Sequence, residues 1–164
     1  MAYRILVFAA FAVATVLSAL SGNHDAAAIT LPSDREAAQF AHCSGPVRMN
    51  CVVDGDTFWY RGAKIRIADI NAPETGEPHC AAEARLGVRA TRRLAELLNA
   101  GAFTLRPADR TRDSYGRRLF TVTRGGQSLG AALETEGLAE HWRGYRGDWC
   151  SRGRNALLIA AVRS

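Results

Sequence analysis

The sequence predicts a small α+β domain that is mainly β, with a five-stranded Greek-key barrel and two to three packed helices. Three observations support this prediction. Five short segments have the composition of strands, a long amphipathic segment follows the third of them, and Gly, Pro, Asn or Asp residues separate the segments. The chain has 164 residues, enough for one domain with a hydrophobic core. An open α+β sandwich is the alternative, because the order of elements does not by itself close a barrel.

The first three predicted strands form a meander with tight turns between them. The strands cover residues 47–53, 57–60 and 64–70, and the turns cover residues 54–56 and 61–63. Alternation of apolar and polar residues supports the first strand, whereas aromatic and β-branched residues support the second. These three strands supply more than half of the predicted barrel.

A long helix follows the third strand. It is predicted over residues 81–98, with an apolar stripe made of Leu86, Ala90, Leu94, Leu97 and Leu98. The remaining elements are a fourth strand over 103–106 ended by Pro107, a charged loop over 109–116, a fifth strand over 119–123, and shorter helices over 33–40, 129–136 and 154–163. Five strands with a helix after the third are typical of an oligonucleotide-binding barrel (OB-fold), which is the fold we expect.

Residues 1–28 have the pattern of a cleaved secretory signal peptide. A positive charge at Arg4 precedes an uncharged apolar run over 5–20, and small residues follow near 21 and near 28. Cleavage at either place fits, and a short membrane anchor is the alternative. We therefore expect an exported protein, periplasmic or secreted, without stable membrane association after cleavage. A lead-in over 29–45 and a single domain over 46–164 would follow.

The charge of the chain suits a polyanionic partner. The full sequence has 21 basic and 16 acidic residues, and removal of Arg4 and Asp25 with the signal leaves 20 and 15, which is still +5. Lys64 is the only lysine, so almost all of the positive charge is carried by arginine. A guanidinium group is planar and binds phosphate oxygens through two donors at once.

Four cysteines follow the signal segment: Cys43, Cys51, Cys80 and Cys150. An even number in an oxidising compartment suggests two disulfides, and three pairings are possible. A Cys43–Cys51 bond would close a short loop, and a Cys80–Cys150 bond would then tie the C-terminal segment to the middle of the chain. A zinc site with histidine is the rival, but no C-x-x-C or H-x-x-x-H spacing supports it.

Residues 53–74 contain more charged and polar side chains than a pair of strands needs for folding. Hydrolysis of a phosphodiester requires a base for water and positive charge for the phosphate. Asp56 and Asn71 can supply oxygen ligands for a hard cation, and Glu74 can act as a base. Arg66 and Arg117 can bind the phosphate. The stretch therefore predicts one half of a metal-assisted phosphodiesterase site.

Five blocks in this order resemble the staphylococcal nuclease (thermonuclease-like) family across residues 47–143. The blocks are V-D-G-D-T at 53–57, Arg66 eight residues before Glu74, A-P-E at 72–74, D-S-Y-G-R at 113–117 and L-E-T-E-G-L-A at 133–139. The resemblance implies an OB-fold barrel with packed helices. It also implies a calcium-dependent endonuclease that cleaves DNA and RNA with low sequence specificity and leaves 3′-phosphates. No protein partner is implied.

The resemblance also implies a role for individual residues. Arg66 and Arg117 match the two catalytic arginines, and Glu74 matches the glutamate that activates water. Tyr115 matches a tyrosine near the phosphate of the bound nucleotide.

The implied metal site departs from the family pattern at one position. Asp56 matches an aspartate ligand and Ala72 a backbone carbonyl ligand, but Asn71 stands where the family has a second aspartate. An amide offers one neutral oxygen, so the ion should bind less tightly. Asp69 points to the same face as Asn71 by strand alternation. Three hypotheses stay open: a nuclease with weak metal affinity, a nuclease that recruits another carboxylate, and a catalytically weakened module that binds nucleic acid without cutting it.

Overall fold

The computed structural model describes residues 34–151, and the statements on structure below concern this part of the chain. The expected signal segment 1–28 and the expected helix over 154–163 lie outside the described residues. Within residues 34–151, no helix is both long enough and apolar enough to cross a membrane.

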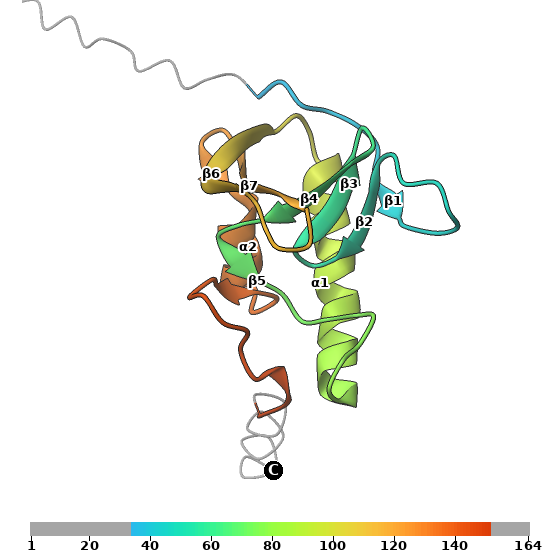
Figure 1. Ribbon diagram of the computed structural model, residues 1–164, viewed down its shortest axis with the longest axis vertical. Coiled ribbons are helices and arrows are strands. Elements are labelled where there is room, and N and C mark those ends of the chain that lie inside the picture. The colour runs from blue at the N-terminus through green and yellow to red at the C-terminus, as the bar shows by residue number, and fades with distance from the viewer. Residues whose placement is uncertain (1–33, 152–164) are drawn as a thin grey trace, which may run out of the picture. The chain divides into compact units, whose positions relative to one another are not determined.

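Seven strands form one mixed sheet, and two short strands form a second (Figure 1). The larger sheet contains β1 (Ala41–His42), β2 (Cys51–Asp54), β3 (Thr57–Tyr60), β4 (Ala63–Ile67), β6 (Thr104–Arg112), β7 (Arg118–Arg124) and β8 (Gln127–Ser128). Its order is β1-β2-β3-β4-β7-β6, with β8 paired to β7. The smaller sheet pairs β5 (Ile70–Asn71) with β9 (Glu140–His141).

The predicted α+β fold of the OB type is confirmed. Strands β2, β3 and β4 form the antiparallel meander, β7 returns parallel to β4, and β6 pairs antiparallel with β7. The chain crosses from β4 to β6 through α1 (Ala81–Asn99), so the helix does follow the third strand of the meander. Among the described residues no strand pairing joins β6 back to β2, so the barrel is not closed by a hydrogen-bonded ladder.

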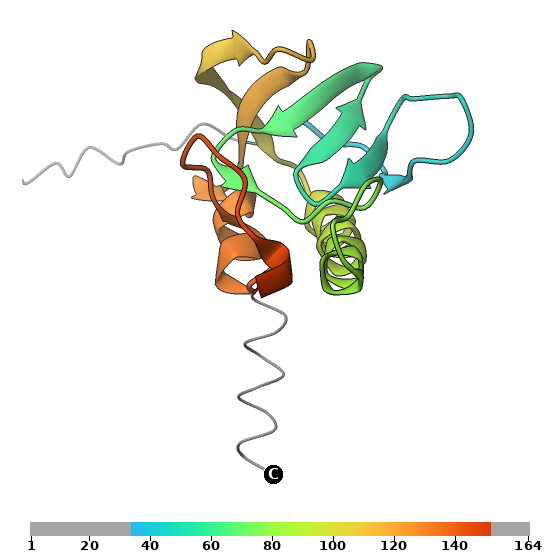
Figure 2. The same cartoon turned by 60° about the horizontal axis from the view of Figure 1, so that its bottom comes forward.

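Both helices lie on the same side of the larger sheet, as Figure 2 shows most clearly. Helix α1 begins at Cys80, whose sulfur accepts a hydrogen bond from the Glu83 amide, and it buries Ala90, Leu94 and Leu98 of the predicted stripe. Ser128 caps the N-terminus of helix α2 (Leu129–Thr135), where its hydroxyl accepts a hydrogen bond from the Ala131 amide. The apolar stripe of α1 faces the sheet. The N-terminal half of the helix contacts the loop after β5 through Glu83 and Gly87.

Four predicted elements differ from the structure. The first strand, expected over 47–53, begins only at Cys51, and Met49 before it is exposed. The expected helix over 33–40 is wrong within the described residues, because Glu36 instead exchanges two backbone hydrogen bonds of 2.9 Å with Phe103. The expected strand over 64–70 is interrupted at 68–69 and continues as β5 in the other sheet. Strand β6 runs through Pro107 to Arg112, because an edge strand tolerates proline and its register shifts at that point.

The disulfides are Cys43–Cys51 and Cys80–Cys150, so no cysteine is left to ligate zinc. The first closes the loop between β1 and β2. The second joins the residue before α1 to the segment after β9, which are 70 residues apart in sequence. This second bond fixes the C-terminal segment beside the loop that follows β5.

Candidate active site

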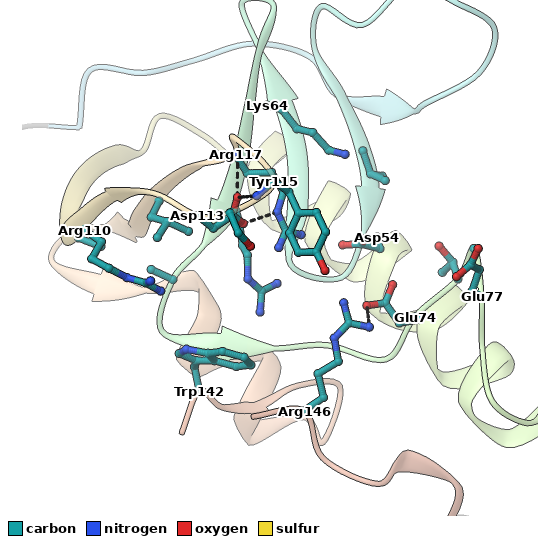
Figure 3. A pocket seen from close by; sticks show the side chains of 18 of the residues that line it. Asp54, Lys64, Glu74, Glu77, Arg110, Asp113, Tyr115, Arg117, Trp142 and Arg146 are labelled. Carbon is teal, nitrogen blue, oxygen red and sulfur yellow. Dashed lines mark hydrogen bonds and ion pairs between the residues drawn. The ribbon is translucent and has the colours of Figure 1, made fainter. Parts of the chain in front are cut away.

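A cleft of about 1110 Å³ opens where β2, β4 and the β6–β7 connection face the segments after β5 and β9. Charged side chains of both signs and two aromatic rings line it (Figure 3). They include Asp54, Lys64, Arg66, Glu74, Arg110, Asp113, Tyr115, Arg117, Trp142 and Arg146. Four of the predicted site residues, Arg66, Glu74, Tyr115 and Arg117, therefore meet in one cleft.

Arg66 is fixed by a buried ion pair with Asp56. One terminal nitrogen of the guanidinium contacts Asp56 Oδ2, and the other donates to the carbonyl oxygen of Ile70 at 3.2 Å. The side chain of Arg66 is only 11% exposed, and its guanidinium carbon lies 5.2 Å from the ring centre of Trp142. The register of β3 and β4, which pairs Thr57 with Arg66, brings these groups together.

Asp56 connects the turn after β2 with the loop after β5. Besides Arg66, it accepts hydrogen bonds from the Ala72 amide at 3.1 Å and the Thr57 hydroxyl at 2.8 Å. Its side chain is almost fully buried. The carboxylate therefore sets the position of the backbone that leads to Glu74.

Arg117 is held by Asp113 across a turn. Its Nε atom donates to Asp113 Oδ2 at 2.6 Å, and the backbone amides of Tyr115 and Arg117 donate to Oδ1 at 3.0 and 2.9 Å. Gly116 adopts a positive φ of 76°, which glycine allows at no steric cost. Burial alone would raise the pKa of Asp113, but the hydrogen bonds from Arg117 and the backbone outweigh it and lower the pKa. Tyr115 itself is 80% exposed.

The carboxylate of Glu74 faces the cleft and pairs with Arg146 at 2.7 Å. Its backbone is held by Glu83, a buried residue of α1 whose two oxygens accept from the amides of Glu74 at 3.3 Å and His79 at 2.7 Å. A Cβ atom at Gly87 would lie 2.7 Å from the carbonyl oxygen of Glu74. The loop therefore packs directly against the backbone of α1, and this contact fixes the distance between Glu74 and the helix.

Asn71 lies beside the cleft and is almost fully buried. Its Nδ2 atom donates to Glu140 Oε1 at 3.5 Å, because Asn71 and Glu140 are paired in the β5–β9 ladder. Asn71 and Ala72 line a small side cavity of about 30 Å³, which shares Glu74 and Arg146 with the main cleft. The amide group thus already has a carboxylate partner.

Negative charge is concentrated at the corner formed by Asp54 and Asp56. Burial and the neighbouring carboxylates of Asp56 and Glu74 raise the pKa of Asp54 to about 7. The described residues contain no group of three or more His, Cys, Asp or Glu side chains placed to hold a metal ion. The donors at this corner are the carboxylates of Asp54 and Asp56, and Asp56 is also paired with Arg66. Carboxylate oxygens suit a hard cation such as Ca²⁺ better than zinc.

Several residues of the site were not predicted from the sequence. Asp54 was assigned to turn chemistry, and nothing in the spacing of Glu83, Gly87 or Arg146 connected them with the cleft. Glu83 and Gly87 lie on a helix whose pattern is explained by its apolar stripe. Arg146 lies in a segment without periodicity, and only the cysteine at 150 hinted that this segment is fixed.

The lowered pKa of Asp113 gives a prediction for stability. Its ionised carboxylate stabilises the fold above the pKa of an unfolded aspartate, about 3.9, and this contribution is lost as the pH falls through the lower folded value. We expect Asp113→Asn to reduce the free energy of unfolding by about 1–2 kcal/mol at pH 7, and the difference from the natural protein to shrink below pH 4. Urea unfolding at several pH values measures it. Asp109→Asn, at an exposed position on β6, is the control, and an equal loss in both variants would contradict the role given to Asp113.

Comparison with known families agrees with the motifs and the fold. The family described as staphylococcal nuclease homologue (SNase) matches residues 64–161, which is 98 of the 164 residues. The matched range begins at β4, so the V-D-G-D-T block lies just before it. No curated protein matches the chain. Because the match covers more than half of the chain and includes Arg66, Glu74 and Arg117, this protein belongs to the staphylococcal nuclease homologue family.

Proposed function

We propose that this protein is an exported, calcium-dependent phosphodiesterase that cleaves DNA and RNA internally with low sequence specificity and leaves 3′-phosphates. The observation that carries the proposal is the convergence of two guanidinium groups and one carboxylate, those of Arg66, Arg117 and Glu74, on one open cleft. Membership of the family supports a nuclease or nucleic-acid-binding function in general.

The two arginines are arranged to receive a phosphate. Asp56 and Asp113 hold them in position, and these contacts use only part of the five N–H donors on each guanidinium. The remaining donors can bind the oxygens of the phosphate. Because both groups are positioned before substrate arrives, they can stabilise the additional negative charge of the five-coordinate transition state without reorganising.

Glu74 is the candidate general base. Its carboxylate lies at the surface of the cleft and is 29% exposed, so water has access to it. In the proposed reaction a carboxylate oxygen of Glu74 accepts the proton of the attacking water, which adds to phosphorus opposite the 5′-oxygen. The bond between phosphorus and the 5′-oxygen then breaks, the 5′-oxygen takes a proton from solvent, and the phosphate stays on the 3′-oxygen. Glu83 and Gly87 act indirectly by holding the backbone of Glu74.

A divalent cation would be held by the Asp56 carboxylate and the Ala72 carbonyl, with Asp54 beside them and Asn71 as a neutral contributor. When bound, it supplies positive charge close to the phosphate. The raised pKa of Asp54 supports such a role, because a cation would relieve the repulsion among these carboxylates.

Low sequence specificity is supported by the composition of the cleft. Arginine and lysine side chains of its lining can contact phosphates, and contacts to phosphates carry no sequence information. Tyr115 and Trp142 offer flat rings on which any base can stack. Export is supported by the signal-like pattern of residues 1–28 and by two disulfides, which persist in oxidising compartments.

A second candidate function is binding without cleavage. The contact between Asn71 and Glu140 favours it, because an amide that is bound to a carboxylate is a weaker ligand than the aspartate of the family pattern. The arginines of the cleft would then serve to bind nucleic acid only.

Digestion of plasmid DNA and of RNA distinguishes the two functions. We expect the oxidised protein, without residues 1–28, to cleave both in calcium and neither in chelator, and the products to carry 3′-phosphates that a phosphatase removes. Glu74→Gln should cleave about 10²–10⁴-fold more slowly while binding still occurs. Binding without cleavage at any calcium concentration would establish the second function.

Position 87 should be sensitive although it is remote from the phosphate. Gly87→Ala improves helix propensity, but its methyl group would meet the Glu74 carbonyl at 2.7 Å and displace the loop. We expect kcat to fall by about tenfold or more, because small displacements of a base are costly. Val88→Ala, at an exposed position of α1, is the control for helix propensity. Unchanged kcat in Gly87→Ala would show that the loop does not position Glu74.

Replacing Asn71 tests the metal site, and the contact between Asn71 and Glu140 calls for a double variant. Asn71→Asp places a second carboxylate against Glu140 and should reduce stability by about 1–3 kcal/mol in chelator. Asn71→Asp with Glu140→Gln restores a donor between the two side chains. We expect this double variant to regain stability and to cleave at lower calcium than the natural protein.

Thermal unfolding in chelator and calcium titration of the cleavage rate measure the two effects, with Glu140→Gln alone as the control. If Asn71→Asp is as stable as the natural protein, Glu140 does not hold the amide.

A further inference from the structure

The segment after β9, residues 142–150, is fastened at several points. Residues 142–148 have no regular secondary structure, and a helical turn begins at Trp149. At its start the Trp142 amide donates to the Asp69 carbonyl at 2.9 Å. Gly147 packs directly on the Glu140 carboxylate, where a Cβ atom would not fit, and Trp149 is buried. At its end Cys150 is bonded to Cys80. The segment therefore has a defined course along the cleft, although most of it is neither helix nor strand.

This segment places one guanidinium group in the cleft, that of Arg146. It contacts Glu74 Oε1 at 2.7 Å, and Figure 3 shows the two side chains reaching toward each other from opposite sides. The side chain of Arg146 is 57% exposed, so donors that Glu74 does not use are accessible from the cleft. None of the motif blocks that identify the family includes residue 146.

The ion pairs of the cleft distinguish Arg146 from Arg66 and Arg117. Arg66 and Arg117 are paired with Asp56 and Asp113, which hold them in place. Arg146 is instead paired with Glu74, the carboxylate that the proposed reaction uses as a base. A phosphate that enters the cleft is a strong competing partner, because arginine binds phosphate oxygens through two donors.

A nucleic acid presents a phosphate at every nucleotide, so a chain lying in the cleft brings more phosphates than the one that is cleaved. Two arginines are already placed at the proposed cleavage point. We propose that Arg146 is a third phosphate-binding arginine of this cleft, and that the Cys80–Cys150 disulfide holds it there by fastening the segment 142–150. The proposal rests on the proposed function of the same cleft, and it adds a substrate contact that the family motifs do not contain.

In this arrangement Glu74 and Arg146 neutralise each other while the cleft is free. When Arg146 turns its donors to a substrate phosphate, the carboxylate of Glu74 becomes available to water. The contact between Glu74 and Arg146 thus couples binding of the substrate to exposure of the base. Each of the two side chains has a partner before and after the substrate binds.

Binding in the absence of cleavage tests the proposal. The probe is a fluorescently labelled single-stranded DNA oligonucleotide in chelator, titrated at several salt concentrations. We expect Arg146→Ala to bind about five- to tenfold more weakly at low salt. The plot of log K against log salt has a negative slope, and its magnitude should decrease by about 0.7, the value for one phosphate contact on a single strand. Arg146→Lys should recover part of the affinity.

Arg93→Ala is the matched control. Arg93 is also a partly exposed arginine that is paired with a glutamate, Glu136 at 2.9 Å, but it lies on α1 outside the cleft. Both variants lose one positive charge, and Arg93→Ala loses two ion pairs, with Glu136 and Glu96, where Arg146→Ala loses one. We expect Arg93→Ala to keep the affinity and salt slope of the natural protein, and equal losses in the two variants would overturn the proposal.

A second background separates a phosphate contact from simple neutralisation of Glu74. The Glu74→Gln variant has a neutral amide in place of the carboxylate, so no counter-charge is needed at this position. If Arg146 contacts phosphate, Arg146→Ala weakens binding in this background as well. If the effect of Arg146→Ala disappears in Glu74→Gln, then Arg146 only neutralises the base, and the proposal is wrong.

Two disulfide variants test how Arg146 is held. Cys80→Ser with Cys150→Ser keeps a hydroxyl at the N-terminal cap of α1, and should bind as weakly as Arg146→Ala. Cys43→Ser with Cys51→Ser should bind like the natural protein. Equal binding by the Cys80/Cys150 variant and the natural protein would overturn the role of the disulfide. Circular dichroism checks that each variant is folded, and the exposed Arg146→Ala change keeps the proposal testable if the disulfide variant does not fold.

The outcomes for this proposal and for the proposed function are distinct. A protein that binds the oligonucleotide but never cleaves in calcium contradicts the nuclease function, while the Arg146 variants still decide the proposal. Normal cleavage with unchanged binding in Arg146→Ala overturns the proposal alone. A natural protein that does not bind even at low salt overturns both.

Discussion

The buried ion pair between Asp56 and Arg66 is the interaction on which the cleft depends. It joins the turn after β2 to strand β4, and the same carboxylate also binds the Ala72 amide of the next loop. Removing one member of a buried pair leaves a charge without compensation, at a cost of about 3–5 kcal/mol. The same contacts fix the guanidinium group of Arg66 and the backbone that leads to Glu74. Stability and the arrangement of the reactive groups therefore depend on one pair of side chains.

Small residues allow the loops to approach closely enough for this arrangement. A Cβ atom at Gly55 would lie 2.6 Å from that of Ala90 and 2.7 Å from that of Ala72, and Gly87 accommodates the carbonyl of Glu74. The turn after β2, the loop after β5 and helix α1 thus meet at positions without bulky side chains. Protein interiors are close-packed, so a single added methyl group at such a point must displace backbone. The geometry of the site is set by this packing as much as by its hydrogen bonds.

Arg66, Arg117 and Arg146 of the cleft each have a carboxylate partner, and Asn71 beside it has Glu140 from β9. The pairs of Arg146 with Glu74 and of Asn71 with Glu140 join elements that are distant in sequence. Asn71 and Glu140 have to be understood together, because an aspartate at position 71 would face a second buried carboxylate. The asparagine is therefore consistent with its local surroundings, although it departs from the family pattern. One substitution in a buried polar network changes what its neighbour can tolerate.

The sequence by itself determined the OB-type fold, the meander, helix α1 and the residues Arg66, Glu74, Arg117 and Tyr115, because hydrophobic periodicity and closely spaced motifs are local signals. It did not determine the division of the third predicted strand, the passage of β6 through Pro107 or the pairing of β5 with β9, since these depend on partner strands far along the chain. The contacts of Asn71 with Glu140 and of Glu74 with Arg146 also join residues about 70 positions apart. Only the tertiary structure decided them, because through-space pairing of charges leaves no periodic trace in a sequence.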